Sequence, residues 1–203
     1  MLTAVNLMND SGMQQPQEMW AAFLKGDDGG LEKLYQLYFD QLYAYGFRYC
    51  ADAVFVEDAI QDLFIKFINT RHRLTTPLSV KNYLFSSFKN HLIDKLRAEK
   101  RQNTFDSPFE FTLAVDDKVM EREQAQLLRQ KMQKAMDQLT ARQREAIYLR
   151  FYENFSYQEI SSMLDLSPKA TYKLMARAIE ALRAIYKVGI AILFWALQSA
   201  FSF

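Results

Sequence analysis

FSYQEISSMLDLSPKATYKLMARAIEAL, residues 155–182, contains two helical segments separated by only a few residues. Ser156 is placed to cap the first helix and Glu159 to return the hydrogen bond, a capping box that marks where a helix begins. Asp165 stands where that helix must end in a left-handed residue, and Ser167 before a proline is typical of a new helix start. The stretch therefore predicts two helices that meet at a sharp corner, at 157–164 and 168–187.

The second of these helices is predicted to have one apolar and one basic face. Its apolar residues recur at helical spacing in Ala170, Leu174, Ala178 and Leu182. Residues 169–187 contain five basic residues and one acid, a net charge of +4, which suits a helix that enters the DNA major groove. An ordinary antiparallel helix pair with a solvated basic face is the alternative. The candidate DNA contacts on this helix are Lys169, Thr171, Tyr172, Lys173 and Arg177.

Helical spacing continues on both sides of this corner, and no alternating pattern predicts a strand. Gly26, Gly29 and Gly30 are expected to separate the first two helices. The sequence predicts an all-α protein with further helices at about 16–25, 31–50, 54–69, 80–101, 123–139 and 141–152.

An acidic stretch divides the chain. Residues 102–121 lose the helical period and carry five acids against one lysine, a net charge of −4, which indicates a linker. We therefore expect two helical domains joined by this acidic linker and followed by an uncharged apolar tail. The predicted bounds are 16–101 for the first domain, 102–121 for the linker, 122–187 for the second domain and 188–203 for the tail.

A second basic helix is predicted at 80–101. Between residues 81 and 101 six basic residues face two acids, again a net charge of +4, and clustered cations gain affinity for DNA by releasing counterions from phosphates. A solvated surface helix is the alternative reading. The candidate DNA contacts here are Lys81, Asn82, Ser86, Lys89, Asn90, Arg97 and Arg101.

The helix at 54–69 has the opposite character. Glu57, Asp58, Gln61 and Asp62 form an acidic ridge, while Val56, Ile60, Phe64 and Phe67 are expected to be buried. Such a ridge would repel DNA and is better suited to a protein partner, although a plain solvated face also explains it.

Composition narrows the function classes. The overall charge of +1 argues against a uniformly basic nucleic-acid binder, so local patches must carry any DNA binding. One cysteine and two histidines supply neither a disulfide nor a four-ligand zinc site, which predicts a reducing compartment, the cytoplasm. Because no nucleophile motif or glycine-rich phosphate loop accompanies the acids, we expect no enzyme, no metal, no cofactor and no small-molecule substrate.

In this order, the segments resemble a bacterial sigma factor of the extracytoplasmic-function (ECF) group of the sigma-70 family, over about residues 20–187. Residues 31–67 are similar to the start of sigma domain 2, with its E-D-x-x-Q-x-x-F pattern at Glu57, Asp58, Gln61 and Phe64. Residues 81–101 resemble the promoter-melting helix, with its N-x-x-x-D-x-x-R pattern at Asn90, Asp94 and Arg97. Residues 136–182 resemble sigma domain 4.

This resemblance implies a promoter-specificity subunit without chemistry of its own. Its partners would be core RNA polymerase (the β′ and β subunits), promoter DNA and an anti-sigma regulator. The loop at 74–79 and the helix at 81–101 would open the −10 element, and the helix at 168–187 would read the −35 element. The implied contacts with the polymerase β′ clamp are Glu57, Asp58, Gln61, Asp62 and Phe64.

Two other functions fit parts of the sequence. A helix-turn-helix regulator that binds duplex DNA without polymerase needs only the second domain, and a helical adaptor needs neither DNA-binding face. The tail, VGIAILFWALQSAFSF at 188–203, is shorter than the roughly 20 residues that cross a bilayer. We expect it to fold back onto the second domain or onto a partner, with membrane contact as the minority alternative.

Overall fold

The computed structural model describes residues 15–100, 109–110, 130 and 133–185. Every regular element in these ranges is a helix, so the all-α prediction is confirmed. The chain forms two compact units, Met1–Asp106 and Ser107–Phe203, as the sequence predicts for a two-domain protein.

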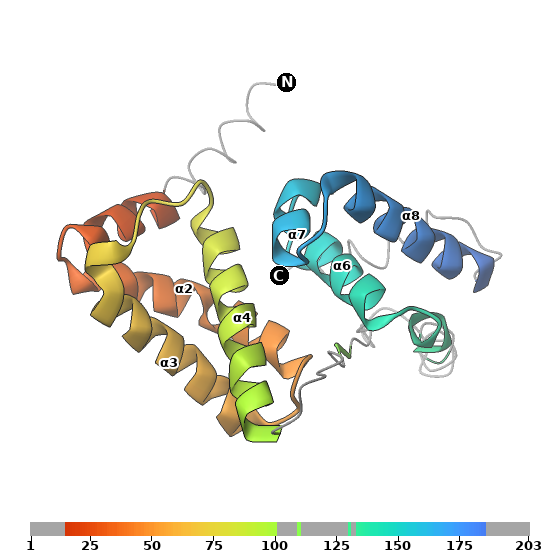
Figure 1. The fold of residues 1–203 in the computed structure, drawn as a ribbon, viewed down its shortest axis with the longest axis horizontal. Coiled ribbons are helices and arrows are strands. Elements are labelled where there is room, and N and C mark those ends of the chain that lie inside the picture. Colours follow the sequence, from red (N-terminus) through yellow and green to blue (C-terminus); the bar gives the residue numbers. More distant parts are fainter. Residues whose placement is uncertain (1–14, 101–108, 111–129, 131–132, 186–203) are drawn as a thin grey trace, which may run out of the picture. The chain divides into compact units, whose positions relative to one another are not determined.

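The first unit is a bundle of four helices, with residues 15–24 helical, then α2 (Asp28–Phe47), α3 (Ala53–Thr70) and α4 (Val80–Lys100). Figure 1 shows α2, α3 and α4 lying against one another, and each pair of the three is in contact. A short 3-10 helix, η1 (Arg71–Arg73), and an irregular loop connect α3 to α4. The helices lie close to their predicted positions.

Two of the three glycines expected to break the chain lie inside α2. The carboxylate of Asp27 accepts a hydrogen bond from the Gly29 backbone N–H at 2.9 Å, so α2 begins three residues earlier than predicted. Gly30 is buried where helix 15–24 crosses α2, and a methyl group there would collide with the Met19 carbonyl and lie 2.9 Å from the Phe23 nitrogen. Gly30 therefore permits close packing rather than a turn.

The core of the first unit contains the seam predicted for α4. Leu84, Phe88, Leu92 and Leu96 are all buried, as are the α3 residues Val56, Ile60, Phe64 and Phe67. Aromatic side chains from three helices meet at Trp20, whose ring contacts Phe67 and Tyr83 edge-to-face at 5.5 and 5.3 Å between centroids. This packing holds α4 across the bundle.

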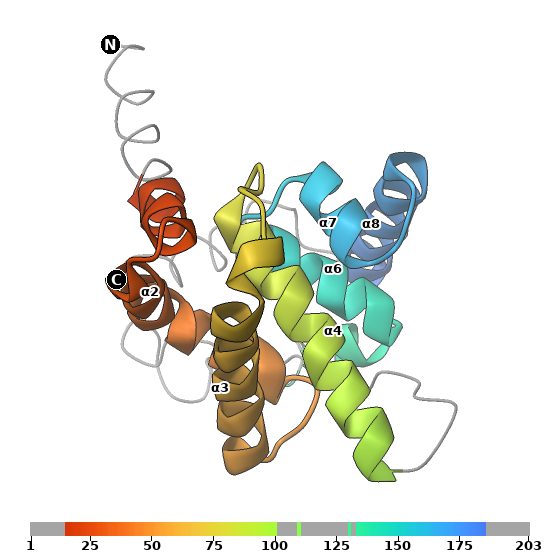
Figure 2. The ribbon, with the colours of Figure 1, turned by 60° about the vertical axis from the view of Figure 1, so that its left-hand side comes forward.

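The second unit carries residues 133–137 in a helical conformation, then α6 (Ala141–Phe151), α7 (Tyr157–Met163) and α8 (Pro168–Ile185). Figure 2 shows α7 joined to α8 by a short corner, and both contact α6. Helix α6 begins with a capping box that was not predicted from the sequence. The Thr140 hydroxyl accepts a hydrogen bond from the Gln143 N–H at 3.3 Å, and the Gln143 side-chain oxygen accepts one from the Thr140 N–H at 2.9 Å.

Part of the predicted linker belongs to the second unit. Phe109 is fully buried, its ring lies 5.6 Å from that of Tyr148, and its carbonyl accepts a hydrogen bond from Arg144 at 3.0 Å. The remainder of 102–121, apart from Glu110, lies outside the described residues, as do Arg101 and the tail at 188–203. Within the described ranges, no helix is both long enough and apolar enough to cross a membrane.

Candidate nucleic-acid and protein interfaces

The corner between α7 and α8 forms as the sequence predicts. Ser156 accepts a hydrogen bond from the Glu159 N–H at 3.3 Å, and the Glu159 carboxylate accepts one from the Ser156 N–H at 2.8 Å. Asp165 is left-handed with φ 51°, and the Ser167 hydroxyl accepts from the Ala170 N–H at 3.2 Å. These bonds fix the direction in which α8 leaves α7.

The outer face of α8 presents cations to solvent. Lys169, Lys173 and Arg177 are exposed, and none of them forms an ion pair with another described residue. Tyr172 is 57% exposed and its ring stacks on that of Tyr157 at 4.5 Å. The four side chains point outward over the first half of the helix, so the positive charges of Lys169, Lys173 and Arg177 are available to an anion.

Thr171 does not belong to this face. It is fully buried, and its hydroxyl donates a hydrogen bond to the Ser167 carbonyl at 3.2 Å. The buried row of α8 runs through Thr171, Met175, Ala178 and Leu182, whereas Ala170 and Leu174 are only half-buried. The predicted apolar row is therefore wrong at its first two positions, where Thr171 and Met175 are buried in place of Ala170 and Leu174. Thr171 is a core residue and not a DNA contact.

The predicted contacts on α4 lie beside one another along one side of the helix. Lys81, Asn82, Ser86 and Lys89 are half-buried, while Asn90 and Arg97 are exposed. The Ser86 hydroxyl donates to the Asn82 side-chain oxygen at 3.4 Å, and the Lys81 ammonium lies 5.4 Å from the centre of the Phe85 ring. This surface is less open than that of α8, because several of its polar groups already contact the protein.

The acidic ridge on α3 faces outward. Glu57, Asp58, Gln61 and Asp62 are exposed. Asp62 is also tied to α4, because the Lys95 ammonium donates to its carboxylate at 2.6 Å and His91 lies at 3.9 Å. The hydrogen bond from Lys95 lowers the pKa of Asp62 below its usual range, so this carboxylate is charged at neutral pH.

Phe64 is a correction to the predicted protein contacts. Only 6% of it is exposed, and its ring packs edge-to-face against those of Tyr35 and Phe67. Phe64 belongs to the same E-D-x-x-Q-x-x-F pattern on α3 as the residues of the acidic ridge, but its side chain points into the bundle. Phe64 therefore supports the ridge from beneath.

Several exposed apolar side chains were not predicted from the sequence, among them Ile65, Ile68 and Leu78. Ile65 and Ile68 on α3 are 55% and 48% exposed, next to the acidic ridge, and Leu78 in the loop before α4 is fully exposed. Ile65 follows Gln61 by four residues, so helical spacing alone places it beside the ridge. No comparable signal marks Leu78, because it lies in an irregular loop.

Two known families match separate parts of this chain. The family of sigma-70 region 2 matches residues 34–102, and that of sigma-70 region 4 matches residues 129–182. The chain belongs to the sigma-70 family. The two matches together cover most of α2, all of α3, α4, α6 and α7, and most of α8, in the order that the resemblance predicts.

Curated relatives place this sigma factor in the ECF group. It is 24% identical over 160 residues to the ECF RNA polymerase sigma factor SigM of Bacillus subtilis, covering 79% of this chain and 97% of the relative. It is 29% identical over 159 residues to SigX of the same organism, covering 74% and 80%. The predicted identity, a promoter-specificity factor acting in transcription initiation, is confirmed.

Two solved structures have a similar fold. CnrH, solved with the cytosolic domain of CnrY, matches with a TM-score of 0.58 and 19% identity over 84% of this chain and 96% of its own. RpoE of Bartonella quintana, solved with the anti-sigma factor NepR, matches with a TM-score of 0.53 and 24% identity over 77% and 96%.

Proposed function

We propose that this sigma factor divides its work among three surfaces: α3 binds core RNA polymerase, loop 74–79 with α4 opens the −10 element, and α8 reads the −35 element. The observation that carries this proposal is the segregation of charge in the folded units. The acidic ridge faces outward on α3, and Lys169, Lys173 and Arg177 face outward on α8. The chemistry of RNA synthesis then belongs to the polymerase.

For α3, the supporting feature is a mixed surface of acids and exposed isoleucines. Interface energy is concentrated in a few desolvated apolar anchors, whereas charges at the rim direct encounter and orientation. Ile65 and Ile68 fit the first role and the acidic ridge fits the second. The partner proposed for this surface is a basic surface with an apolar centre, and the family resemblance supports the clamp of the β′ subunit as that surface.

For the −10 element, the supporting feature is an apolar side chain beside a basic helix. Apolar wedges that insert between base steps unstack DNA, at a cost of about a few kcal/mol per step. Leu78 supplies such a wedge, and α4 supplies cations and amide groups for the exposed strand through Lys81, Asn82, Lys89 and Asn90.

For the −35 element, the supporting feature is the free cationic face at the start of α8. A recognition helix places the residues of its first turns at base edges, and each good base contact is worth about 1–3 kcal/mol. Lys169, Tyr172 and Lys173 lie in these turns, and Arg177 follows one turn later at a position suited to a phosphate.

An anti-sigma protein is the third proposed partner. Both structural relatives were solved in complexes, and the partner of the Bartonella quintana protein is named as an anti-sigma factor. A protein that covers the acidic ridge or the α8 face would keep this sigma factor from polymerase or promoter.

Two charge reversals test the division of labour. Asp62→Lys should weaken binding to purified core polymerase about tenfold or more, because the ridge would then repel a basic partner. Lys173→Glu should leave core binding unchanged and weaken promoter binding by the holoenzyme about tenfold. Asp40→Lys and Lys33→Glu, at exposed positions on α2, are the matched controls.

The measurements are core-binding titrations and run-off transcription from genomic fragments with start-site mapping. If both reversals lose the same activity to the same extent, the division is wrong. A wild-type chain that binds the mapped promoters equally well with and without core polymerase would instead establish a stand-alone helix-turn-helix regulator.

A further inference from the structure

Helix 15–24 holds the loop between η1 and α4 at both ends. The Trp20 indole N–H donates a hydrogen bond to the Thr75 carbonyl at 3.1 Å, and the Gln17 amide donates to the Leu78 carbonyl at 2.9 Å. More than fifty residues of chain separate each donor from its acceptor. Figure 1 shows this helix, in red, beside the yellow segment that leads into α4.

Trp20 is itself immobilised by the core. It is fully buried, and its ring makes edge-to-face contacts with Phe67 of α3 and Tyr83 in the first turn of α4. A fully buried side chain held by such packing can act as a rigid reference point for the loop that it binds. The position of Thr75 is therefore set relative to both α3 and α4.

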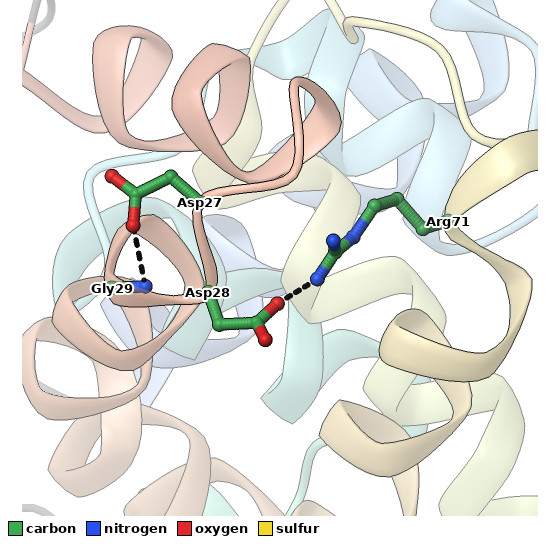
Figure 3. A network of polar contacts seen from close by, with 4 residues as sticks. All are labelled: Asp27, Asp28, Gly29 and Arg71. Carbon is green, nitrogen blue, oxygen red and sulfur yellow. Dashed lines mark hydrogen bonds and ion pairs between the residues drawn. The ribbon is translucent and has the colours of Figure 1, made fainter.

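A second contact ties the base of the same loop to the N-terminal part of the bundle. Arg71, the first residue of η1, forms an ion pair with Asp28 at the start of α2, next to the Asp27 cap (Figure 3). Its guanidinium also lies 4.5 Å from the centre of the Phe23 ring, on helix 15–24. The loop is thus held where it begins as well as along its length.

The loop needs such support because it presents an apolar side chain without burying it. Leu78 is fully exposed, so burial of its side chain contributes nothing to holding the loop in place. Its carbonyl is nevertheless held by Gln17, and the neighbouring Ser79 hydroxyl accepts a hydrogen bond from the Asn82 N–H at 3.2 Å. The backbone is fixed while the side chain projects into solvent.

We propose that helix 15–24 is a clamp that positions loop 74–79 for strand opening, with Trp20 and Gln17 as its positioning residues. The proposal rests on the proposed role of this loop at the −10 element and adds a helix that precedes the family match at 34–102. A loop ordered in advance loses little conformational entropy when it enters the base stack, so more of its binding free energy is used to open DNA.

The test compares duplex and pre-opened templates. Trp20→Phe keeps an aromatic ring but removes the N–H donor, and Gln17→Leu removes the second donor at a partly exposed position. Gln36→Leu is the matched control, because among the described residues the Gln36 amide bonds only to Glu32, within α2. Each full-length variant is assayed with core polymerase on a promoter mapped with the wild-type chain, as a duplex and as a heteroduplex with an unpaired −10 element.

On the duplex, each clamp variant should initiate about fivefold less transcription than wild type, as expected for one lost hydrogen bond, and the double variant should lose more. On the pre-opened template both variants should come within about twofold of wild type, because the clamp matters only for opening. Core binding and the urea midpoint of Gln17→Leu should match those of Gln36→Leu.

Equal losses on both templates would overturn the proposal, since the variants would then act through folding or core binding. Unchanged duplex transcription by Gln17→Leu and the double variant would overturn it as well. If Trp20→Phe does not fold, Gln17→Leu alone decides between these outcomes. A wild-type chain that supports no initiation with core polymerase would refute the proposed function itself, a result distinct from failure of the clamp.

Discussion

The two basic helices, α4 and α8, have the same net charge in the sequence but differ in how much of that charge is available. On α4, Lys95 is held by Asp62 at 2.6 Å and Arg97 lies 3.5 Å from Asp94. On α8, Lys173 is exposed and forms no ion pair within the part of the chain that the structure describes. The net charge of a helix therefore predicts a basic surface, but the fold determines which of its charges can bind a ligand.

The largest expected difference between the two helices concerns stability. Phe88 on α4 is fully buried, so Phe88→Ala should reduce the free energy of unfolding of the first unit by about 3–5 kcal/mol. Tyr172→Ala on α8 removes an exposed ring and should cost the second unit about 1 kcal/mol or less. Urea unfolding of the full chain, followed for each unit, measures both values, and comparable losses would mean that α8 is as deeply packed as α4.

A smaller difference should appear in the salt dependence of promoter binding. Each cation that neutralises a phosphate contributes about 0.9 to the slope of log affinity against log salt concentration. Arg177→Ala should therefore reduce the slope by about 0.9, whereas Lys95→Ala should reduce it by less, because Lys95 must first leave Asp62. Titrations of the holoenzyme with promoter DNA at several salt concentrations measure the two slopes. Equal reductions for Arg177→Ala and Lys95→Ala would mean that the ion pair with Asp62 does not limit the access of Lys95 to phosphate.

The ion pair between Asp62 and Lys95 should contribute little to the stability of the folded unit. Because the Asp62 side chain is 50% exposed, a double-mutant cycle with Asp62→Asn and Lys95→Met should give a coupling of about 0.2–1 kcal/mol. The pKa of Asp62 is lowered mainly by the hydrogen bond from Lys95. The pair therefore stabilises the folded unit above the ordinary aspartate pKa, and this contribution is lost as pH falls through the lower folded value.

The cycle is measured by urea unfolding at neutral and acidic pH. The Asp94–Arg97 pair, which joins neighbouring turns of α4, is the control for an exposed ion pair without a second helix. A coupling for Asp62–Lys95 that is unchanged at high salt would contradict a screened pair.

The smallest expected effect is the pH response of His91. Burial lowers its pKa from 6.5, and the charges that face it are Asp62 and Asp94, which raise the pKa, and Lys66 and Lys95, which lower it. Below pH 6.5 the unfolded chain binds this proton more readily than the folded unit, so stability should fall as pH decreases through this window. His91→Gln should remove that part of the pH dependence of stability, which amounts to about 1 kcal/mol or less. The prediction is wrong if the urea midpoint of the wild type, like that of the variant, is the same at pH 5.5 and pH 7.5.

Much of the candidate site was readable in the sequence, because the relevant signals are local. Ser156 with Glu159 specifies a helix start through contacts three residues apart, and Asp165 specifies the corner through its own backbone. The resemblance to the sigma family rests on short motifs in a fixed order, on the helices at 54–69 and 80–101 and in the helix-turn-helix segment. Each of these inferences needs only neighbours in the chain.

The errors arise where a side chain's direction depends on distant packing. Thr171 and Phe64 occupy plausible contact positions, but the neighbouring helices place them in the cores of their units. Gly30 looks like a breaker because the sequence predicts the helix that contains Met19 and Phe23 but does not show that this helix packs closely against Gly30. A shift of one residue rotates a helix face by about 100°. Exposure therefore follows from packing rather than from period.

The sequence by itself determined most of the helices, the caps of α7 and α8 and the alternation of acidic and basic segments, and its motifs supplied the resemblance to the family. Only the tertiary structure decided that Lys95 forms an ion pair with Asp62 and that Phe109 packs into the second unit. It also decided that Trp20 and Gln17 form hydrogen bonds with a loop more than fifty residues away. The physical reason is the range of the forces involved. Caps and periodicity act within a few residues, whereas ion pairs, packing and long-range hydrogen bonds exist only after the chain has brought distant residues together.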